Sequence, residues 1–93
     1  MSADSAYTFD AAQPWMLSPQ VALRPEQFGA LAYHYGNRRL TFLKSPTLVS
    51  LVEHLGDFDN VEVAVDASVQ PHERAAYVAA LARLAASEVL VAR

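Results

Sequence analysis

Two runs of alternating side chains between residues 28 and 44, on either side of a Gly36-Asn37 pair, form a pattern typical of a β-hairpin. A two-residue loop at this pair sets the register of the two strands. The opposing residues are then Tyr35 and Arg38, Tyr33 and Leu40, and Leu31 and Phe42, so that the large apolar side chains share one face. The other face carries Ala30, Ala32, His34, Arg39, Thr41 and Leu43. A hairpin followed directly by a helix start restricts the chain to a small number of folds.

The hairpin completes a predicted three-stranded antiparallel meander. Prolines punctuate residues 14–25 and leave room for one short strand before the hairpin, with Val21 and Leu23 on one face. The three strands cover about residues 20–24, 29–35 and 38–43. Residues 89–91 form either a terminal extension or a short edge strand.

Two short helices are predicted after the meander. Ser45 is a good N-cap, Pro46 suits the first helical position, and apolar side chains follow at helical spacing. A capping-box pattern at residues 59–62 indicates a second helix that ends near residue 67. Alternating valines in the same segment are also typical of a strand, so both structures stay open there.

A third helix is predicted from near Pro71 to about Ser87, with its larger apolar side chains along one side. The opposite face carries Ala75, Ala79, Ala82 and Ala86. Alanine is either present there as the best helix former, or it provides a smooth surface that another chain approaches closely. With a meander ahead of three helices, the fold class is α+β.

Composition excludes several classes of function. The chain has 93 residues, enough for one domain with a modest core, and its net charge of −3 argues against a general nucleic-acid binder. It contains no cysteine, and His34, His54 and His72 fall in different predicted elements without partners at metal-ligand spacing. No catalytic motif occurs. We therefore expect no catalytic residue, no metal and no cofactor.

The N-terminal segment differs from the rest of the chain. Residues 1–13 show neither the helical nor the strand period, which predicts a flexible tail ahead of a single domain at residues 14–93. Tyr7, Phe9 and Trp15 either pack loosely over the sheet edge or bind a partner. No signal-like N-terminus and no apolar run of membrane-spanning length occurs, so we expect a soluble, cytoplasmic protein without a membrane contact.

Five of the seven basic residues lie on or beside the last predicted strand or on the third helix: Arg38, Arg39, Lys44, Arg74 and Arg83. Charges at an exposed strand normally deter aggregation. They also suit the attraction of an acidic, extended segment that adds itself to the sheet as a fourth strand through main-chain hydrogen bonds. Both explanations stay open.

Five blocks of sequence carry a resemblance to a known family: Pro14-Trp15, Pro19-Gln-Val-Ala-Leu-Arg-Pro25, Phe28-Gly-Ala-Leu-Ala-Tyr-His-Tyr-Gly36, Arg39-Leu-Thr-Phe-Leu-Lys-Ser45 and Ala80-Leu-Ala-Arg-Leu-Ala-Ala86. Over about residues 9–91 the chain resembles the winged-helix-like pyrroloquinoline quinone chaperone clan, whose members recognise ribosomally made precursor peptides. It resembles the mycofactocin-system peptide chaperones more closely. The clan often ends its last helix with a glycine, where this chain has Ser87-Glu88.

The resemblance implies a non-enzymatic protein that binds the leader of a precursor peptide and presents it to a radical S-adenosylmethionine maturase. In such proteins the leader pairs with the third strand and lies against the third helix. The peptide-binding residues implied for this chain are Arg38, Arg39, Leu40, Thr41, Phe42, Leu43, Tyr77, Ala80, Leu81 and Leu84. Leu81 and Leu84 are equally well explained as core residues. Replacing Thr41 by proline would remove a donor for the guest if the Thr41 N–H faces outward.

Two other classes of function remain as alternatives. A winged-helix regulator would dock a helix in the major groove of DNA, but this requires a basic reading helix. Residues 47–55 and 60–67 contain no lysine or arginine, and the third helix carries only two such residues. An interaction subunit would bind a partner protein through the alanine face and take no peptide. Because an unpaired strand edge also invites self-pairing, we expect a monomer or a weak homodimer.

Overall fold

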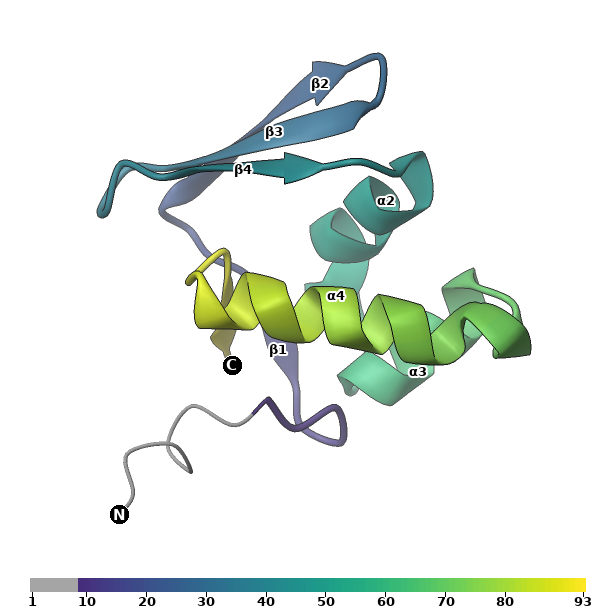
Figure 1. Ribbon diagram of the computed structural model, residues 1–93. Helices are drawn as coiled ribbons and strands as arrows, with labels where there is room; N and C mark the ends of the chain where they lie inside the picture. Colours follow the sequence, from purple (N-terminus) through teal and green to yellow (C-terminus); the bar gives the residue numbers. More distant parts are fainter. Residues whose placement is uncertain (1–8) are drawn as a thin grey trace.

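The meander lies on one side of the molecule and the helices lie on the other (Figure 1). The computed structural model describes residues 9–93. In chain order its elements are β1 (Trp15–Leu17), β2 (Val21–Glu26), β3 (Gly29–His34), β4 (Leu40–Leu43), α2 (Pro46–His54), η1 (Leu55–Asp57), α3 (Val61–Ser68), η2 (Pro71–Glu73), α4 (Arg74–Ala86) and β5 (Leu90–Ala92). This α+β order, with a three-stranded meander before three α-helices, confirms the predicted fold class.

The meander is an antiparallel sheet in the order β2-β3-β4. Tyr33 lies opposite Leu40 and Leu31 lies opposite Phe42, which confirms the register predicted for these two pairs, whereas the predicted Tyr35-Arg38 pair is not part of the ladder. Within the described residues β4 pairs with β3 alone, so β4 is an edge strand of this sheet.

The predicted two-residue turn at Gly36-Asn37 is wrong, although the register is right. The strands end at His34 and resume at Leu40, and Arg38 takes the left-handed conformation with φ 63°. The buried His34 ring explains the wider turn, because its Nδ1 accepts hydrogen bonds from the Gly36 and Asn37 N–H groups at 3.0 and 3.1 Å. The Arg38 N–H then donates to the His34 carbonyl oxygen at 2.7 Å and closes the turn.

The two faces of the sheet differ in the size of their side chains. The face towards the helices carries Ala30 and Ala32, each 1% exposed, and the buried Leu43. The opposite face carries Leu40 and Phe42, which are 62% and 59% exposed. Small side chains on the inner face allow α2 to pack against β3, so the large apolar side chains of the hairpin remain on the surface.

Side-chain caps begin helices α2 and α3. The Ser45 hydroxyl accepts from the Leu48 N–H at 3.2 Å, with Pro46 at the first helical position, as predicted for α2. The segment that also resembled a strand is helical and forms α3. Its N-cap is Asn60 rather than the first residue of the predicted capping box, because the Asn60 side chain accepts from the Val63 N–H at 2.9 Å.

The last helix, α4, ends in a turn that glycine usually occupies. The Val89 N–H donates to the Leu84 carbonyl at 2.9 Å and the Glu88 N–H to the Ala85 carbonyl at 3.1 Å, a pair of bonds known as the Schellman motif. Glu88 therefore holds a left-handed φ of 69° at the position where the clan often has glycine. The motif turns the chain back so that β5 runs antiparallel to β1.

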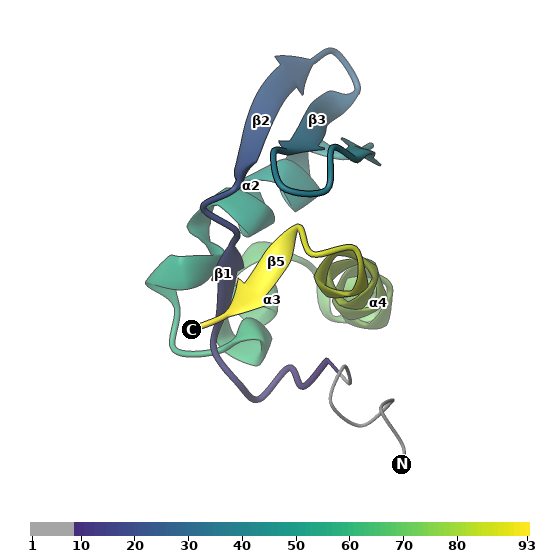
Figure 2. The same cartoon turned by 90° about the vertical axis from the view of Figure 1, so that its left-hand side faces the viewer.

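The pairing of β1 with β5 was only half predicted. For residues 89–91 the sequence allowed a terminal extension or a short edge strand, and β5 shows that the strand is correct. The sequence shows no strand pattern for β1, which is three residues long and close to Pro14. Figure 2 shows this pair side by side below the meander, next to α4. The C-terminal Arg93 guanidinium donates to the carbonyl oxygens of Gly56 and Phe58, which joins the end of β5 to the turn after η1.

The N-terminal tail predicted for residues 1–13 falls mostly on residues 1–8, which lie outside the described residues. Phe9 contacts Trp15 with ring centroids 5.0 Å apart. The Glu62 N–H donates to the Ala11 carbonyl at 3.0 Å, so this segment lies against the start of α3. Tyr7 is outside the described residues, while Phe9 and Trp15 pack against the core.

One core fills the space between the inner face of the meander, the helices and the β1-β5 pair. Its fully buried large side chains are Leu43, Leu51, Val52, Leu55, Val61, Val65, Leu81, Val89 and Leu90. Among residues 9–93, no helix has the length and apolar character needed to cross a membrane.

Candidate functional site

The outer edge of β4 presents backbone groups that the sheet does not use. The His34 N–H donates to the Arg39 carbonyl oxygen at 3.0 Å. This bond determines which residues of β4 bond to β3, because bonded and non-bonded pairs alternate along an antiparallel ladder. Residues 39, 41 and 43 therefore direct their N–H and C=O groups towards β3, and Leu40 and Phe42 direct theirs outward. The N–H of Thr41 faces β3, so the informative position for a proline substitution is Phe42 rather than Thr41.

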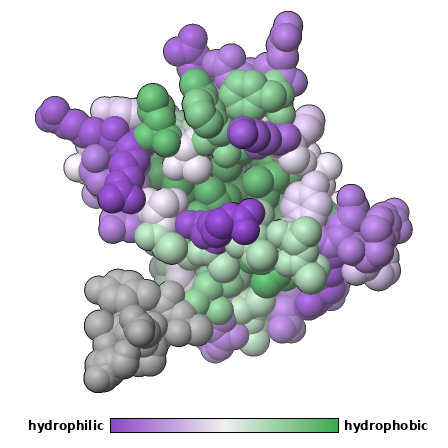
Figure 3. Space-filling view, in the orientation of Figure 1, coloured by the Kyte–Doolittle hydropathy of each residue, from purple (hydrophilic) through white to green (hydrophobic). Residues whose placement is uncertain are grey.

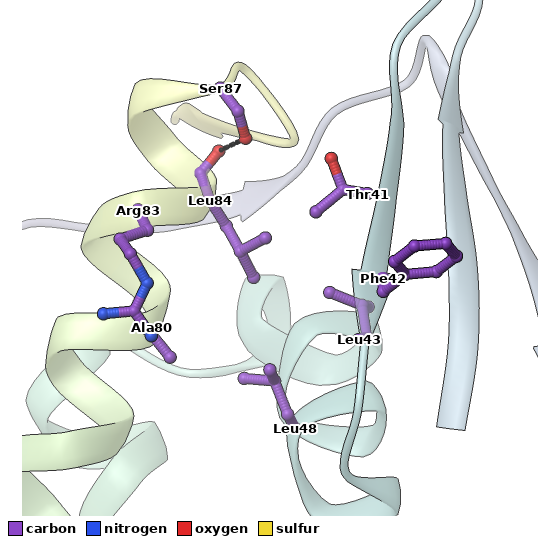
Figure 4. Close-up of a pocket in the computed structure, with 8 residues that line it drawn as sticks. All are labelled: Thr41, Phe42, Leu43, Leu48, Ala80, Arg83, Leu84 and Ser87. Carbon is purple, nitrogen blue, oxygen red and sulfur yellow. Dashed lines mark hydrogen bonds between the residues drawn. The ribbon is translucent and has the colours of Figure 1, made fainter. Parts of the chain in front are cut away.

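A groove with a volume of about 300 Å³ lies between this edge and α4 (Figure 4). We call it the α4 groove, and its lining residues are Thr41, Phe42, Leu43, Leu48, Ala80, Arg83, Leu84 and Ser87. In Figure 4, Thr41 and Leu43 point from β4 towards α4, whereas the Phe42 ring points to the other side of the strand. The groove can therefore receive side chains of an extended segment that runs along β4.

The wall formed by α4 is largely apolar and carries one charge. Ala80 leaves space beside the helix, and Leu84 points towards β4. The Ser87 hydroxyl is used locally, because it donates to the Leu84 carbonyl oxygen at 3.2 Å. Arg83 supplies the charged side chain at the groove. The surface suits apolar side chains with an anionic group beside them.

The structure brings half of the sequence-predicted site residues together in the α4 groove: Thr41, Phe42, Leu43, Ala80 and Leu84. Arg38, Arg39 and Leu40 are exposed at the turn end of β4 and extend the same edge. Leu81 is fully buried in the core. Tyr77 is half-buried, and its hydroxyl lies 3.0 Å from the Ser45 hydroxyl rather than in the groove.

Three groove residues were missed as site residues by sequence reasoning. Leu48 belongs to the apolar stripe of α2 and was indistinguishable from core, and Ser87 looked like a helix end. Arg83 was noted only as one of several basic residues. Its helical position, one turn after Ala80 and next to Leu84, is the signal that could have placed it at the groove.

Charge along the edge is uncompensated in the described part of the chain. Residues 9–93 form ion pairs between Arg24 and Glu26, His54 and Asp57, and Arg74 and Asp66. Arg38, Arg39, Lys44 and Arg83 take part in none of them. Arg74, which the sequence grouped with these cations, is 2.8 Å from Asp66 and belongs to the α3-α4 contact instead. The edge is thus locally basic although the chain carries a net charge of −3.

The three histidines have separate surroundings. His34 is buried in the β3-β4 turn, His54 lies 3.3 Å from Asp57 at the end of α2, and His72 is exposed in η2. Among residues 9–93, no group of three or more histidine and carboxylate side chains is placed to hold a metal ion.

This chain is similar over most of its length to a family of known proteins. Residues 14–91 match the peptide chaperone MftB family. The curated peptide chaperones MftB of Mycobacterium tuberculosis and Mycobacterium ulcerans are each 46% identical to this chain, over 92 and 91 residues, or 98% and 97% of the chain and 84% of each relative. That of Mycolicibacterium smegmatis is 46% identical over 85 residues, 90% of this chain and 83% of the relative. No solved structure matches. The chain belongs to the peptide chaperone MftB family.

Proposed function

We propose that this chaperone binds the leader of a ribosomally made precursor peptide along β4 and presents it to a radical S-adenosylmethionine maturase of mycofactocin biosynthesis. The observation that carries the proposal is the open edge of β4, where the backbone groups of Leu40 and Phe42 face outward beside the α4 groove. The name of the family, peptide chaperone, supports a peptide as the guest.

Strand addition uses both the backbone and the side chains of the guest. The outward N–H and C=O groups of Phe42 and Leu40 would each bond to the main chain of the guest, which gives affinity that depends little on sequence. Guest residues opposite Thr41 and Leu43 would direct their side chains into the α4 groove. Apolar side chains fit there, because Leu43, Leu48 and Leu84 line the groove.

The charge of the edge favours an acidic guest. Arg38 and Arg39 lie at one end of β4, Lys44 lies at the other end, and Arg83 lies across the groove. Complementary charge of this kind raises the rate of encounter more than it raises the final affinity. After binding, the guest itself becomes the edge strand, and its outer side is accessible to a maturase.

The backbone bond can be tested by a pair of substitutions at one position. Phe42→Pro removes both the ring and the outward N–H, whereas Phe42→Ala removes the ring alone, and neither change breaks a bond to β3. The probe is a fluorescein-labelled leader peptide from a short open reading frame beside the gene, with binding followed by anisotropy. We expect Phe42→Pro to bind more weakly than Phe42→Ala by about 1 kcal/mol, the net value of one hydrogen bond.

Circular dichroism of both variants controls for folding. Equal affinity of two folded variants would contradict strand addition at this edge. Presentation is tested separately, by pulling down the maturase with the chaperone in the presence and absence of the precursor. A capture that does not depend on the precursor would favour a plain interaction subunit.

A further inference from the structure

A second hollow lies on the other face of the edge strand. It has a volume of about 270 Å³ and is lined by Phe28, Phe42 and Lys44, and we call it the outer hollow. Phe42 lines both this hollow and the α4 groove. The two hollows therefore flank the same stretch of β4, one on each face of the sheet.

The surface around the outer hollow is apolar and exposed. The Phe28 and Phe42 rings meet edge to face with centroids 5.8 Å apart, and the Tyr33 and Tyr35 rings do so at 5.4 Å. Leu40 continues this surface towards the turn. Figure 3 shows hydrophobic residues gathered over the sheet and the region below it, with hydrophilic side chains between them. Exposed aromatic groups of this kind usually mark a contact surface.

The geometry of strand addition identifies the occupant. Side chains of an added strand point alternately to the two faces of the sheet, and residues directly opposite one another share a face. A guest residue opposite Phe42 therefore lies on the outer face, while its two neighbours, opposite Thr41 and Leu43, enter the α4 groove. One extended peptide thus reaches both hollows.

We propose that the leader peptide fills both hollows at once, with its apolar side chains pointing alternately into the α4 groove and onto the Phe28-Phe42 pair. This inference rests on the proposed function. It predicts a guest with apolar residues at consecutive positions, because both of its faces are covered, rather than the alternating pattern of a strand with one face in water.

Charge adds a second requirement for the guest. Lys44 borders the outer hollow and Arg83 borders the α4 groove, and neither forms an ion pair with another described residue. A carboxylate near the apolar side chain on each face would pair with these cations. The substrate class is therefore an extended segment in which acidic residues flank a short apolar core.

Variants of the outer hollow test the proposal on the full-length chain with the fluorescein-labelled leader peptide as probe. We expect Phe28→Ala to weaken binding about tenfold, as for an aromatic anchor, and Lys44→Gln about threefold. Matched controls are Val63→Ala, which removes an exposed apolar side chain on α3, and Arg24→Gln, which removes a cation from the far strand of the sheet. Both controls are expected to bind as the wild type does.

An alanine scan of the peptide separates this inference from the proposed function. The inference is supported if alanine weakens binding both at peptide positions that face the α4 groove and at those that face the outer hollow, and if the latter positions no longer matter in the Phe28→Ala variant. If alanine weakens binding only at the positions that face the α4 groove, and the folded Phe28→Ala variant binds with wild-type affinity, the inference is overturned and strand addition stays intact. Wild-type peptide affinity of Phe28→Ala together with weaker capture of the maturase also overturns it, by assigning the outer hollow to that protein. Failure of the peptide to bind at all overturns both.

Discussion

The hydroxyl groups of Ser45 and Tyr77 lie 3.0 Å apart and connect the first turn of α2 to α4. Ser45 follows β4 almost directly, and its hydroxyl also caps α2. This contact therefore holds α4 at a fixed distance from the end of the edge strand. Tyr77, which the sequence suggested as a peptide contact, acts in the structure as a support for the groove.

Removing either partner of this contact is expected to lower stability. Tyr77→Phe loses one hydrogen bond, worth about 1 kcal/mol of unfolding free energy, and Ser45→Ala loses the same bond and the helix cap, about 1–2 kcal/mol. Urea unfolding of the two single variants and the double variant measures the coupling. Tyr35→Phe, on an exposed ring, serves as the control. Strictly additive losses would contradict a direct interaction between the two hydroxyl groups.

Glycine at position 88 is expected to stabilise the chain. Glu88 has a φ of 69°, a conformation that costs a residue with a Cβ atom about 1 kcal/mol relative to glycine. Glu88→Gly should therefore raise the unfolding free energy by roughly that amount. The same change at the neighbouring Ser87, whose φ is −91°, should lower it. A fall in stability for Glu88→Gly would show that the side chain makes a compensating contact.

The buried ring of His34 is expected to determine the shape of the β3-β4 turn. His34→Ala leaves the Gly36 and Asn37 N–H groups without their acceptor and should cost about 2 kcal/mol of unfolding free energy. His72→Ala, on an exposed side chain, should change stability by less than about 0.5 kcal/mol. Amide hydrogen exchange at residues 35–39 locates the effect. Unchanged protection there in the His34 variant would contradict this role.

Binding of the leader is expected to depend on salt through its association rate. Arg38 and Arg39 lie exposed beside the edge, outside the ion pairs of the described residues, so their attraction for an acidic guest is screened as ionic strength rises. Stopped-flow measurement at low and high salt should show a falling association rate and a nearly constant dissociation rate. Substituting glutamine for both arginines should remove most of this salt dependence. Arg74→Gln, which alters a paired cation, should preserve it.

The sequence predicted those parts of the fold that depend on local patterns. Alternation in the hairpin fixed the Tyr33-Leu40 register, and the Ser45-Pro46 pair located the start of α2. It failed where a distant partner decides the structure. β1 is three residues long and is a strand because β5 pairs with it. The turn after β3 was missed for a different reason: the His34 Nδ1 accepts from N–H groups only two and three residues further on, a local contact that the Gly36-Asn37 pattern does not predict.

The sequence predicted the candidate site only in outline, because its details depend on how distant elements pack together. The edge strand followed from the meander, but the sequence could not tell which N–H groups face outward, and it assigned this role conditionally to Thr41. It gave no reason to expect the large side chains of the hairpin on the outside, because the small inner residues Ala30 and Ala32 matter only when α2 packs on them. The expectation that the chain is not an enzyme is confirmed by its membership in a family of peptide chaperones.

The cations at the two ends of β4 also affect how two copies of this chain meet. Suppose that β4 paired antiparallel with β4 of a second copy about a two-fold axis at Thr41. Leu40 would then lie opposite Phe42 of the second copy, and their outward N–H and C=O groups would bond to each other. The turn end of one copy, with Arg38 and Arg39, would then lie near Lys44 of the second copy, twice, and like charges that are close together repel. In this register, the cations proposed to attract an acidic leader would also oppose the pairing of two empty copies through β4.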